Sequence, residues 1–120
     1  MHLGATVGAR SIAVRPEVEM AWLLRRGEVL ASVDVSGRSQ RARGVDGVSV
    51  TRSHVVHTFG ARGALDVAYL SDDLVVLSTR HLARRRVGAP ALSARLVLRA
   101  GSGSFERWSL RPGDELELKE

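Results

Sequence analysis

The feature that most constrains the fold is the alternation of apolar and polar residues within short segments. In "EVLASVDV", residues 28–35, one face of an extended chain would carry Val29, Ala31, Val33 and Val35, and the other Glu28, Ser32 and Asp34. A period of two residues is typical of a β-strand that buries one face. "ALSARLVLRA" repeats the pattern, with Leu92, Ala94, Leu96 and Leu98 expected inside and Ser93, Arg95 and Arg99 outside. In "ELELK", Leu116 and Leu118 are expected inside.

Turn residues separate these segments. Gly27 in "RRGE" favours a tight hairpin between "AWLL" and the strand from residue 28, because glycine tolerates positive φ. "SDD", 71–73, predicts a turn between "ALDVAYL" and "LVVLS". In "ALDVAYL" one face would carry Leu65, Val67 and Tyr69, and the other Asp66 and Ala68. "LVVLS", 74–78, is apolar throughout and predicts a strand covered on both faces.

Two segments have helical features, and both are short. "SGRSQRARG" offers Ser36 or Ser39 as an N-cap and Gly44 as a C-terminal stop. "GSFERWSL" places Phe105 and Trp108 on one helical face, with Ser104 as the expected N-cap, and these aromatic rings are expected to anchor the helix. In "RPGDE", Pro112 and Gly113 suit the centre of a type II turn. Many short strands with one or two short helices predict an all-β fold, a small antiparallel β-sandwich or a distorted barrel.

The length of 120 residues predicts one domain, and its 44% hydrophobic and 26% charged residues are typical of a globular chain. Residues 1–20 are expected to form an extension, weakly structured or with one edge strand at 11–14, and residues 21–120 a single β domain. Met20 is an alternative natural start, since the pattern becomes regular after it. An exposed edge strand in such a domain would allow a monomer or a weak dimer.

Composition narrows the function classes. The chain has no cysteine, which excludes disulfides and cysteine-based metal sites. No segment approaches the ~18 apolar residues of a membrane span, and residues 1–20 lack the basic start and apolar stretch of a secretory signal. We therefore expect a soluble, cytoplasmic protein. The net charge is +5, but the arginines are scattered, and only "RHLARRR", Arg80 to Arg86, forms a cluster.

The order of these segments resembles the bacterial and archaeal domain-of-unknown-function family 192. The resemblance covers about a hundred residues from Trp22 onward, and its most specific parts are "HTFGARGALDV" and "WSLRPGDELEL". It implies a compact β-sandwich or distorted barrel and assigns no chemistry. The chain departs from the family where a bulky residue is usual, at Ala61, Gly63 and Ala64, and it has "GVDG" in place of a leucine-rich run.

The best candidate site is the polar group His57, Thr58, Arg62 and Asp66. A guanidinium can hold a carboxylate or phosphate, a histidine can change charge near neutral pH, and a carboxylate can orient either. We therefore predict a binding or accessory module with a shallow cleft for a small anionic or polyhydroxylated ligand, or for a protein partner. The structural alternative is that Asp66 pairs with Arg62 or caps loop amides.

Other functions are less well supported. A hydrolase would need His57 beside Asp66, and Ser53 could complete a triad, but no nucleophile-elbow motif is present. His54 and His57 would point to opposite faces of a strand, so no metal site is predicted, and no cofactor motif is found. The Arg80 to Arg86 cluster could contact nucleic-acid phosphates, but no stacking aromatics accompany it. Four further arginines could extend this surface: Arg38, Arg41, Arg43 and Arg52.

Overall fold

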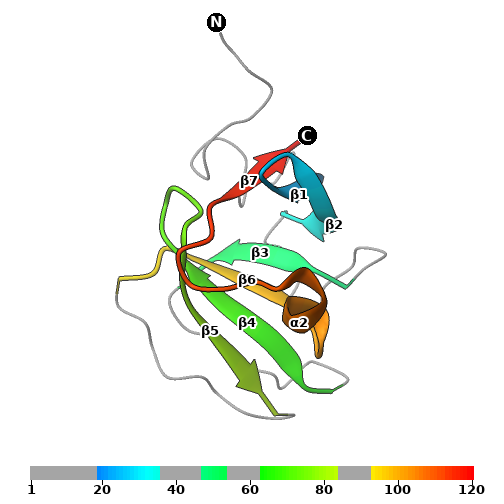
Figure 1. Ribbon diagram of the computed structural model, residues 1–120, viewed down its shortest axis with the longest axis vertical. Helices are drawn as coiled ribbons and strands as arrows, with labels where there is room; N and C mark the ends of the chain where they lie inside the picture. Colours follow the sequence, from blue (N-terminus) through cyan, green and yellow to red (C-terminus); the bar gives the residue numbers. More distant parts are fainter. Residues whose placement is uncertain (1–18, 36–46, 54–62, 84–92) are drawn as a thin grey trace, which may run out of the picture.

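A computed structural model of the chain describes residues 19–35, 47–53, 63–83 and 93–120 (Figure 1). These ranges contain seven strands and one short helix, α2. The strands are β1 Met20–Arg25, β2 Glu28–Asp34, β3 Ser49–Arg52, β4 Leu65–Leu70, β5 Val76–Leu82, β6 Leu96–Gly101 and β7 Leu116–Lys119, and α2 spans Ser104–Trp108. The expected strand at 11–14 and the expected helix at 36–44 lie outside the described residues.

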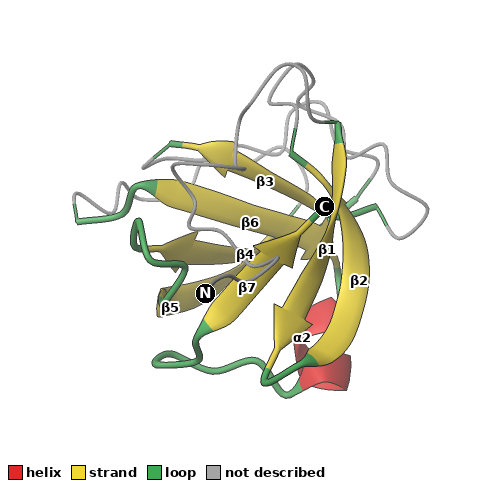
Figure 2. Cartoon of the chain, turned by 90° about the horizontal axis from the view of Figure 1, so that it is seen from above, coloured by secondary structure: helices red, strands yellow, loops and turns green. Residues whose placement is uncertain are grey.

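The strands form a single curved sheet in the order β5-β4-β6-β3-β2-β1-β7. In Figure 1, β1, β2 and β7 lie at the top and β4 and β5 at the bottom. The two outer strands meet where each begins, because Val75 bridges Glu115 and the N–H of Val76 donates to Asp114 O at 2.8 Å. This contact makes the sheet a distorted barrel, and Figure 2 shows α2 at its lower end. The all-β prediction is confirmed. One strand pair, β2 with β3, is parallel, through Asp34 and Ser49.

The hairpin predicted between β1 and β2 is confirmed. Arg25 pairs with Glu28, and the two residues between them, Arg26 and Gly27, have φ values of 54° and 79°. Positive φ at both central positions is the geometry of a type I′ turn, which matches the twist of the flanking strands. The register then shifts between Leu23 and Leu24, as a β-bulge does.

This bulge overturns one prediction. Leu23 pairs with Ala31 and Leu24 with Val29, so Leu30 is the extra residue and the alternation changes phase there. Val29, expected inside with Ala31, is therefore 54% exposed, and Leu30 packs against the core instead.

The interior of the barrel is filled by small and medium aliphatic side chains from every strand and by Phe105 of α2. Its largest fully buried members are Leu23, Leu70, Leu74, Leu96, Leu98 and Leu118. A second cluster covers the other face of β4 and β6 and contains Val67, Tyr69, Ala94 and Val97, with Leu65 and Leu82 against it. Leu65, Val67 and Tyr69 therefore share a face as predicted, and Ala68 lies in the main core.

Two expectations about exposure are wrong. The strand predicted at 74–78 begins at Val76, and Leu77 is 38% exposed, because β5 is the outermost strand in the sheet order. This strand continues through Arg80 and His81, so the first part of the cluster from Arg80 to Arg86 belongs to β5. Arg99, expected outside, is only 8% exposed, because the outer face of β6 is buried as well as the inner one.

The predicted helix and turn near the carboxyl end are both present. Ser104 is not the N-cap: Gly103 holds that position at φ 94°, and the Ser104 hydroxyl accepts a hydrogen bond from Arg107. The Pro112–Gly113 turn has Gly113 at φ 94°, and the N–H of Asp114 donates to Arg111 O at 3.1 Å. Within the described ranges, no helix is both long and apolar enough to cross a membrane.

Candidate functional site

Asp66 is the one member of the predicted polar group that the structure places. It lies on β4, is 7% exposed, and accepts hydrogen bonds on Oδ2 from the backbone N–H groups of Gly103 at 2.9 Å and Phe105 at 3.1 Å. These amides belong to the first turn of α2, whose N-cap has no side-chain hydrogen bond of its own. The carboxylate therefore does from a distant strand what an N-cap side chain does locally. This arrangement matches the structural alternative, in which Asp66 caps loop amides.

His81 supplies the second contact of Asp66. Its Nδ1 lies 3.0 Å from Asp66 Oδ1, and the histidine side chain is 58% exposed. His57, Thr58 and Arg62 lie outside the described residues. A contact between a histidine and a carboxylate also occurs in catalytic triads, but no hydroxyl in the described ranges hydrogen-bonds to His81. The register could have indicated this pair, since Asp66 and His81 are opposite each other across the β4–β5 hairpin.

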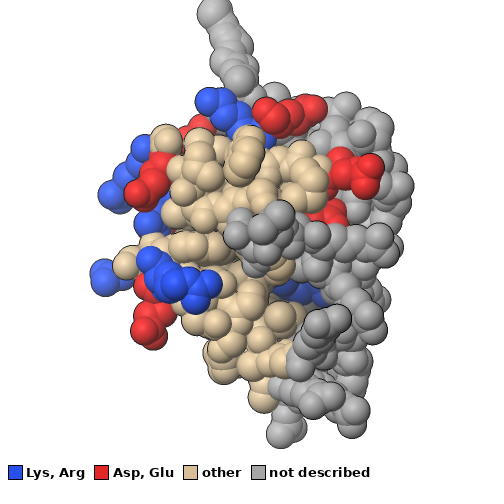
Figure 3. Space-filling model, turned by 90° about the vertical axis from the view of Figure 1, so that its right-hand side faces the viewer, with Lys and Arg blue, Asp and Glu red and all other residues tan. Residues whose placement is uncertain are grey.

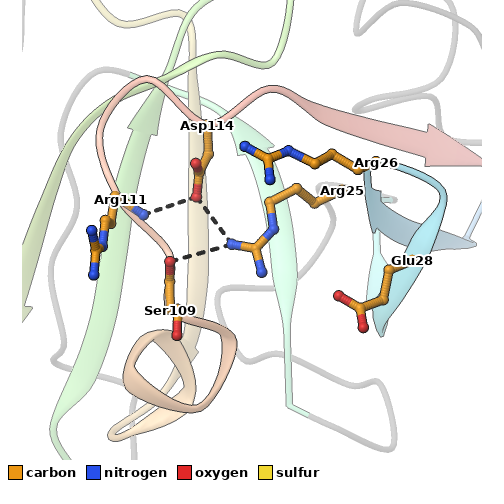
Figure 4. Close-up of a pocket in the computed structure, with 6 residues that line it drawn as sticks. All are labelled: Arg25, Arg26, Glu28, Ser109, Arg111 and Asp114. Carbon is orange, nitrogen blue, oxygen red and sulfur yellow. Dashed lines mark hydrogen bonds and ion pairs between the residues drawn. The ribbon is translucent and has the colours of Figure 1, made fainter.

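A cleft of about 380 Å³ opens at the β1–β2 hairpin and the turn that follows α2 (Figure 4). The residues that line it are Arg25, Arg26, Glu28, Ser109, Arg111 and Asp114. We call it the arginine cleft. The sequence interpretation missed it, because its members come from two turns more than 80 positions apart and carry no motif.

The guanidinium of Arg25 is fixed in the arginine cleft by three hydrogen bonds. Its guanidinium donates to Asp114 Oδ2 at 3.0 Å, to Trp108 O at 2.6 Å and to Ser109 O at 3.3 Å. Two of these acceptors are carbonyl groups at the carboxyl end of α2, where a cation is favoured. Arg25 therefore ties the hairpin to the helix end and the following turn.

Asp114 is the other fixed group. The backbone N–H of Arg111 donates to its Oδ2 at 3.0 Å and lowers the pKa of this carboxyl below its ordinary value. Burial opposes this effect by raising the pKa, and the Arg25 guanidinium adds to the lowering. The carboxylate therefore stays ionised at neutral pH and holds Arg25 in place.

The other two arginines of the cleft are not held by hydrogen bonds to described residues. No described residue accepts a hydrogen bond from the guanidinium of Arg26 or of Arg111, and both residues are exposed. Three guanidinium groups against two carboxylates leave the cleft with one net positive charge. An adjoining recess of about 390 Å³ shares Arg26 and Asp114 but is acidic, since Asp73, Glu115 and Glu117 line it.

The described residues include no candidate metal centre, and the face in Figure 3 carries charges of both signs. No group of three or more histidine, aspartate or glutamate residues within them could hold a metal ion. On the face shown in Figure 3, lysine and arginine are interspersed with aspartate and glutamate. Of the cluster from Arg80 to Arg86, residues 84–86 lie outside the described part.

Comparison with family models, curated proteins and solved structures finds no match to this chain.

Proposed function

We propose that this protein is a small binding module whose arginine cleft holds a compact anionic ligand that also carries hydroxyl groups. One observation carries the proposal: Arg26 and Arg111 line the cleft, and no described residue accepts a hydrogen bond from either guanidinium. Guanidinium groups bind carboxylates and phosphates through paired hydrogen bonds. Glu28, on the opposite wall, provides an acceptor for ligand hydroxyl groups.

Binding is better supported than catalysis at this cleft. Its two carboxylates are Glu28 and Asp114, and Asp114 is committed to Arg25 and to the Arg111 amide. A general acid or base has to gain and lose a proton in each turnover. The hydrogen bonds that Asp114 accepts stabilise its ionised form and so oppose its protonation. Membership of the domain-of-unknown-function family 192, in a divergent form, is part of the same proposal, and it rests on the segments "HTFGARGALDV" and "WSLRPGDELEL".

The proposal is tested by titrating ¹⁵N-labelled protein with glucose 6-phosphate and gluconate, using glucose as the uncharged control. We expect saturable shifts at Arg26, Ser109 and Arg111. Each charge-assisted hydrogen bond contributes about 1.5 to 3 kcal/mol, so the Arg26→Gln and Arg111→Gln variants should each weaken binding roughly 10-fold or more. The matched control is Arg95→Gln, which removes an exposed arginine that lines neither recess.

Two results would reject the proposal. The first is that neither anionic sugar shifts the resonances of Arg26 and Arg111. The second is that the double variant Arg26→Gln/Arg111→Gln binds as tightly as the wild type does.

A further inference from the structure

Three buried polar residues lie side by side on neighbouring strands, away from the arginine cleft. Asp34 on β2 pairs with Ser49 on β3, and Ser49 pairs with Arg99 on β6. Their exposed fractions are 6%, 2% and 8%. Residues directly opposite each other in a sheet project from the same face, with Cβ atoms about 5 Å apart. The three side chains therefore form one row, which we call the polar row.

The polar row faces away from the barrel interior. The chain neighbours of each member point into the main core: Val33 and Val35 flank Asp34, Val48 and Val50 flank Ser49, and Leu98 and Ala100 flank Arg99. Because side chains alternate along a strand, the row occupies the outer face. Val67, which pairs with Arg99 from β4, continues that face into the second apolar cluster. An aspartate, an arginine and a serine are thus buried beside an apolar surface.

One member of the row is a fully buried polar group without a hydrogen-bond partner, Ser49 Oγ. No described residue accepts a hydrogen bond from the Arg99 guanidinium, and Arg99 keeps an exposed fraction of 8%. Burial lowers the pKa of Arg99, and the negative charge of Asp34 opposes this through space. A buried hydroxyl without a partner destabilises the folded protein, because its hydrogen bonds to water are lost and not replaced. Native proteins keep such groups where a ligand or an ordered water completes them.

We propose that Arg99 and Ser49 form a second binding site, specific for the carboxylate of a small organic acid, on the outer face of β3 and β6. The guanidinium can donate two parallel hydrogen bonds to a carboxylate, and the serine hydroxyl can donate a third. Asp34 already supplies one negative charge beside Arg99. A singly charged carboxylate therefore suits the row better than a doubly charged phosphate, which Asp34 would repel. Close burial restricts the ligand to a few heavy atoms.

The experiment uses acetate and the Arg26→Gln/Arg111→Gln variant, in which the arginine cleft has lost its free guanidinium groups. We expect a saturable shift of the Arg99 Nε–H and Ser49 amide resonances with acetate, and no equivalent shift with sodium chloride at matched ionic strength. Ser49→Ala should weaken acetate binding roughly 10- to 150-fold, the value of one hydrogen bond to a charged group. Arg99→Lys keeps the charge but loses the planar fork, and should weaken it further.

The outcomes separate the two sites. Acetate shifts at Ser49 that persist in the cleft variant support the second site, even if the cleft binds nothing. The inference is overturned if acetate up to about 100 mM, far above the millimolar affinity expected for so small a ligand, shifts neither resonance. It is also overturned if phosphate binds there more tightly than acetate, or if Ser49→Ala binds acetate unchanged. Should the Arg99 variant fail to fold, the wild-type titration and Ser49→Ala still decide.

Discussion

Replacing Asp66 by alanine tests the claim that one carboxylate on β4 organises the start of α2. The substitution removes the acceptor of two backbone N–H groups, those of Gly103 and Phe105, and the partner of His81. The Phe105 contact is buried and the Gly103 contact is partly buried. Water can therefore replace the carboxylate at Gly103 more easily than at Phe105.

The expected loss of stability follows from these exposures. A buried donor left without an acceptor costs about 1 to 3 kcal/mol, so we assign about 2 kcal/mol to Phe105 and about 1 kcal/mol to Gly103. The His81 side chain is 58% exposed, so its contact with Asp66 contributes at most about 0.5 kcal/mol. The total of about 3 kcal/mol is a large part of the stability of a small domain and should lower Tm by roughly 10 to 20 °C.

Urea unfolding followed by tryptophan fluorescence measures this loss, since Trp108 lies at the end of α2. Hydrogen exchange at the Phe105 amide gives an independent local readout. Asp66→Asn keeps one acceptor oxygen and should lose about half as much as alanine does. His81→Gln is the control and should change the free energy of unfolding by less than about 0.5 kcal/mol. If Asp66→Ala loses less than about 1 kcal/mol, or if exchange at Phe105 is no faster, the capping argument is wrong.

Two further predictions concern the arginine cleft. The lowered pKa of Asp114 means that its contribution to stability is present above its unfolded pKa, ordinarily 3.8, and is lost as pH falls through the folded value. Asp114→Asn should therefore flatten the acid limb of a stability–pH curve measured by urea unfolding between pH 2 and 7, and an unchanged limb would contradict this. Arg26→Asn should raise the free energy of unfolding by about 0.5 to 1 kcal/mol, because asparagine tolerates the positive φ of a type I′ turn better than arginine does. A loss of stability in that variant would mean that the Arg26 side chain stabilises the fold.

The period-two pattern predicted most strands because each carries its own alternation, as β2 and β7 do. It failed where a strand is defined by distant partners. β3, Ser49–Arg52, has only four residues and is fixed by β6, about 45 positions away, so its own sequence contains too little to reveal it. The exposure of Val29 also depends on a bulge, which shifts the phase of the pattern without any turn residue to mark it.

The polar residues were harder to predict than the strands. Alternation assigns the residues of a strand to two faces, but it does not show whether the second face is exposed to solvent. Arg99 lies on such a second face and is buried. Asp66 could be identified from the sequence as a candidate site residue, but the two backbone amides that donate to it lie 37 and 39 positions away. These hydrogen bonds form only when β6 pairs with β4, because α2 directly follows β6 in the chain. Hydrogen-bond partners of this kind depend on tertiary packing, which no local pattern contains.

Arg26 and Arg111, whose guanidinium groups have no acceptor among the described residues, both lie in tight turns. This position favours ligand binding. Arg26 is a central residue of the β1–β2 turn, and Arg111 opens the Pro112–Gly113 turn, whose Asp114 amide and side chain both return to it. The Arg25–Asp114 ion pair joins these turns to each other. Their backbones are therefore ordered before any ligand arrives, and only side-chain freedom is lost on binding. The same reasoning predicts that breaking the tie, with Arg25→Gln, weakens binding of an anion that contacts only Arg26 and Arg111.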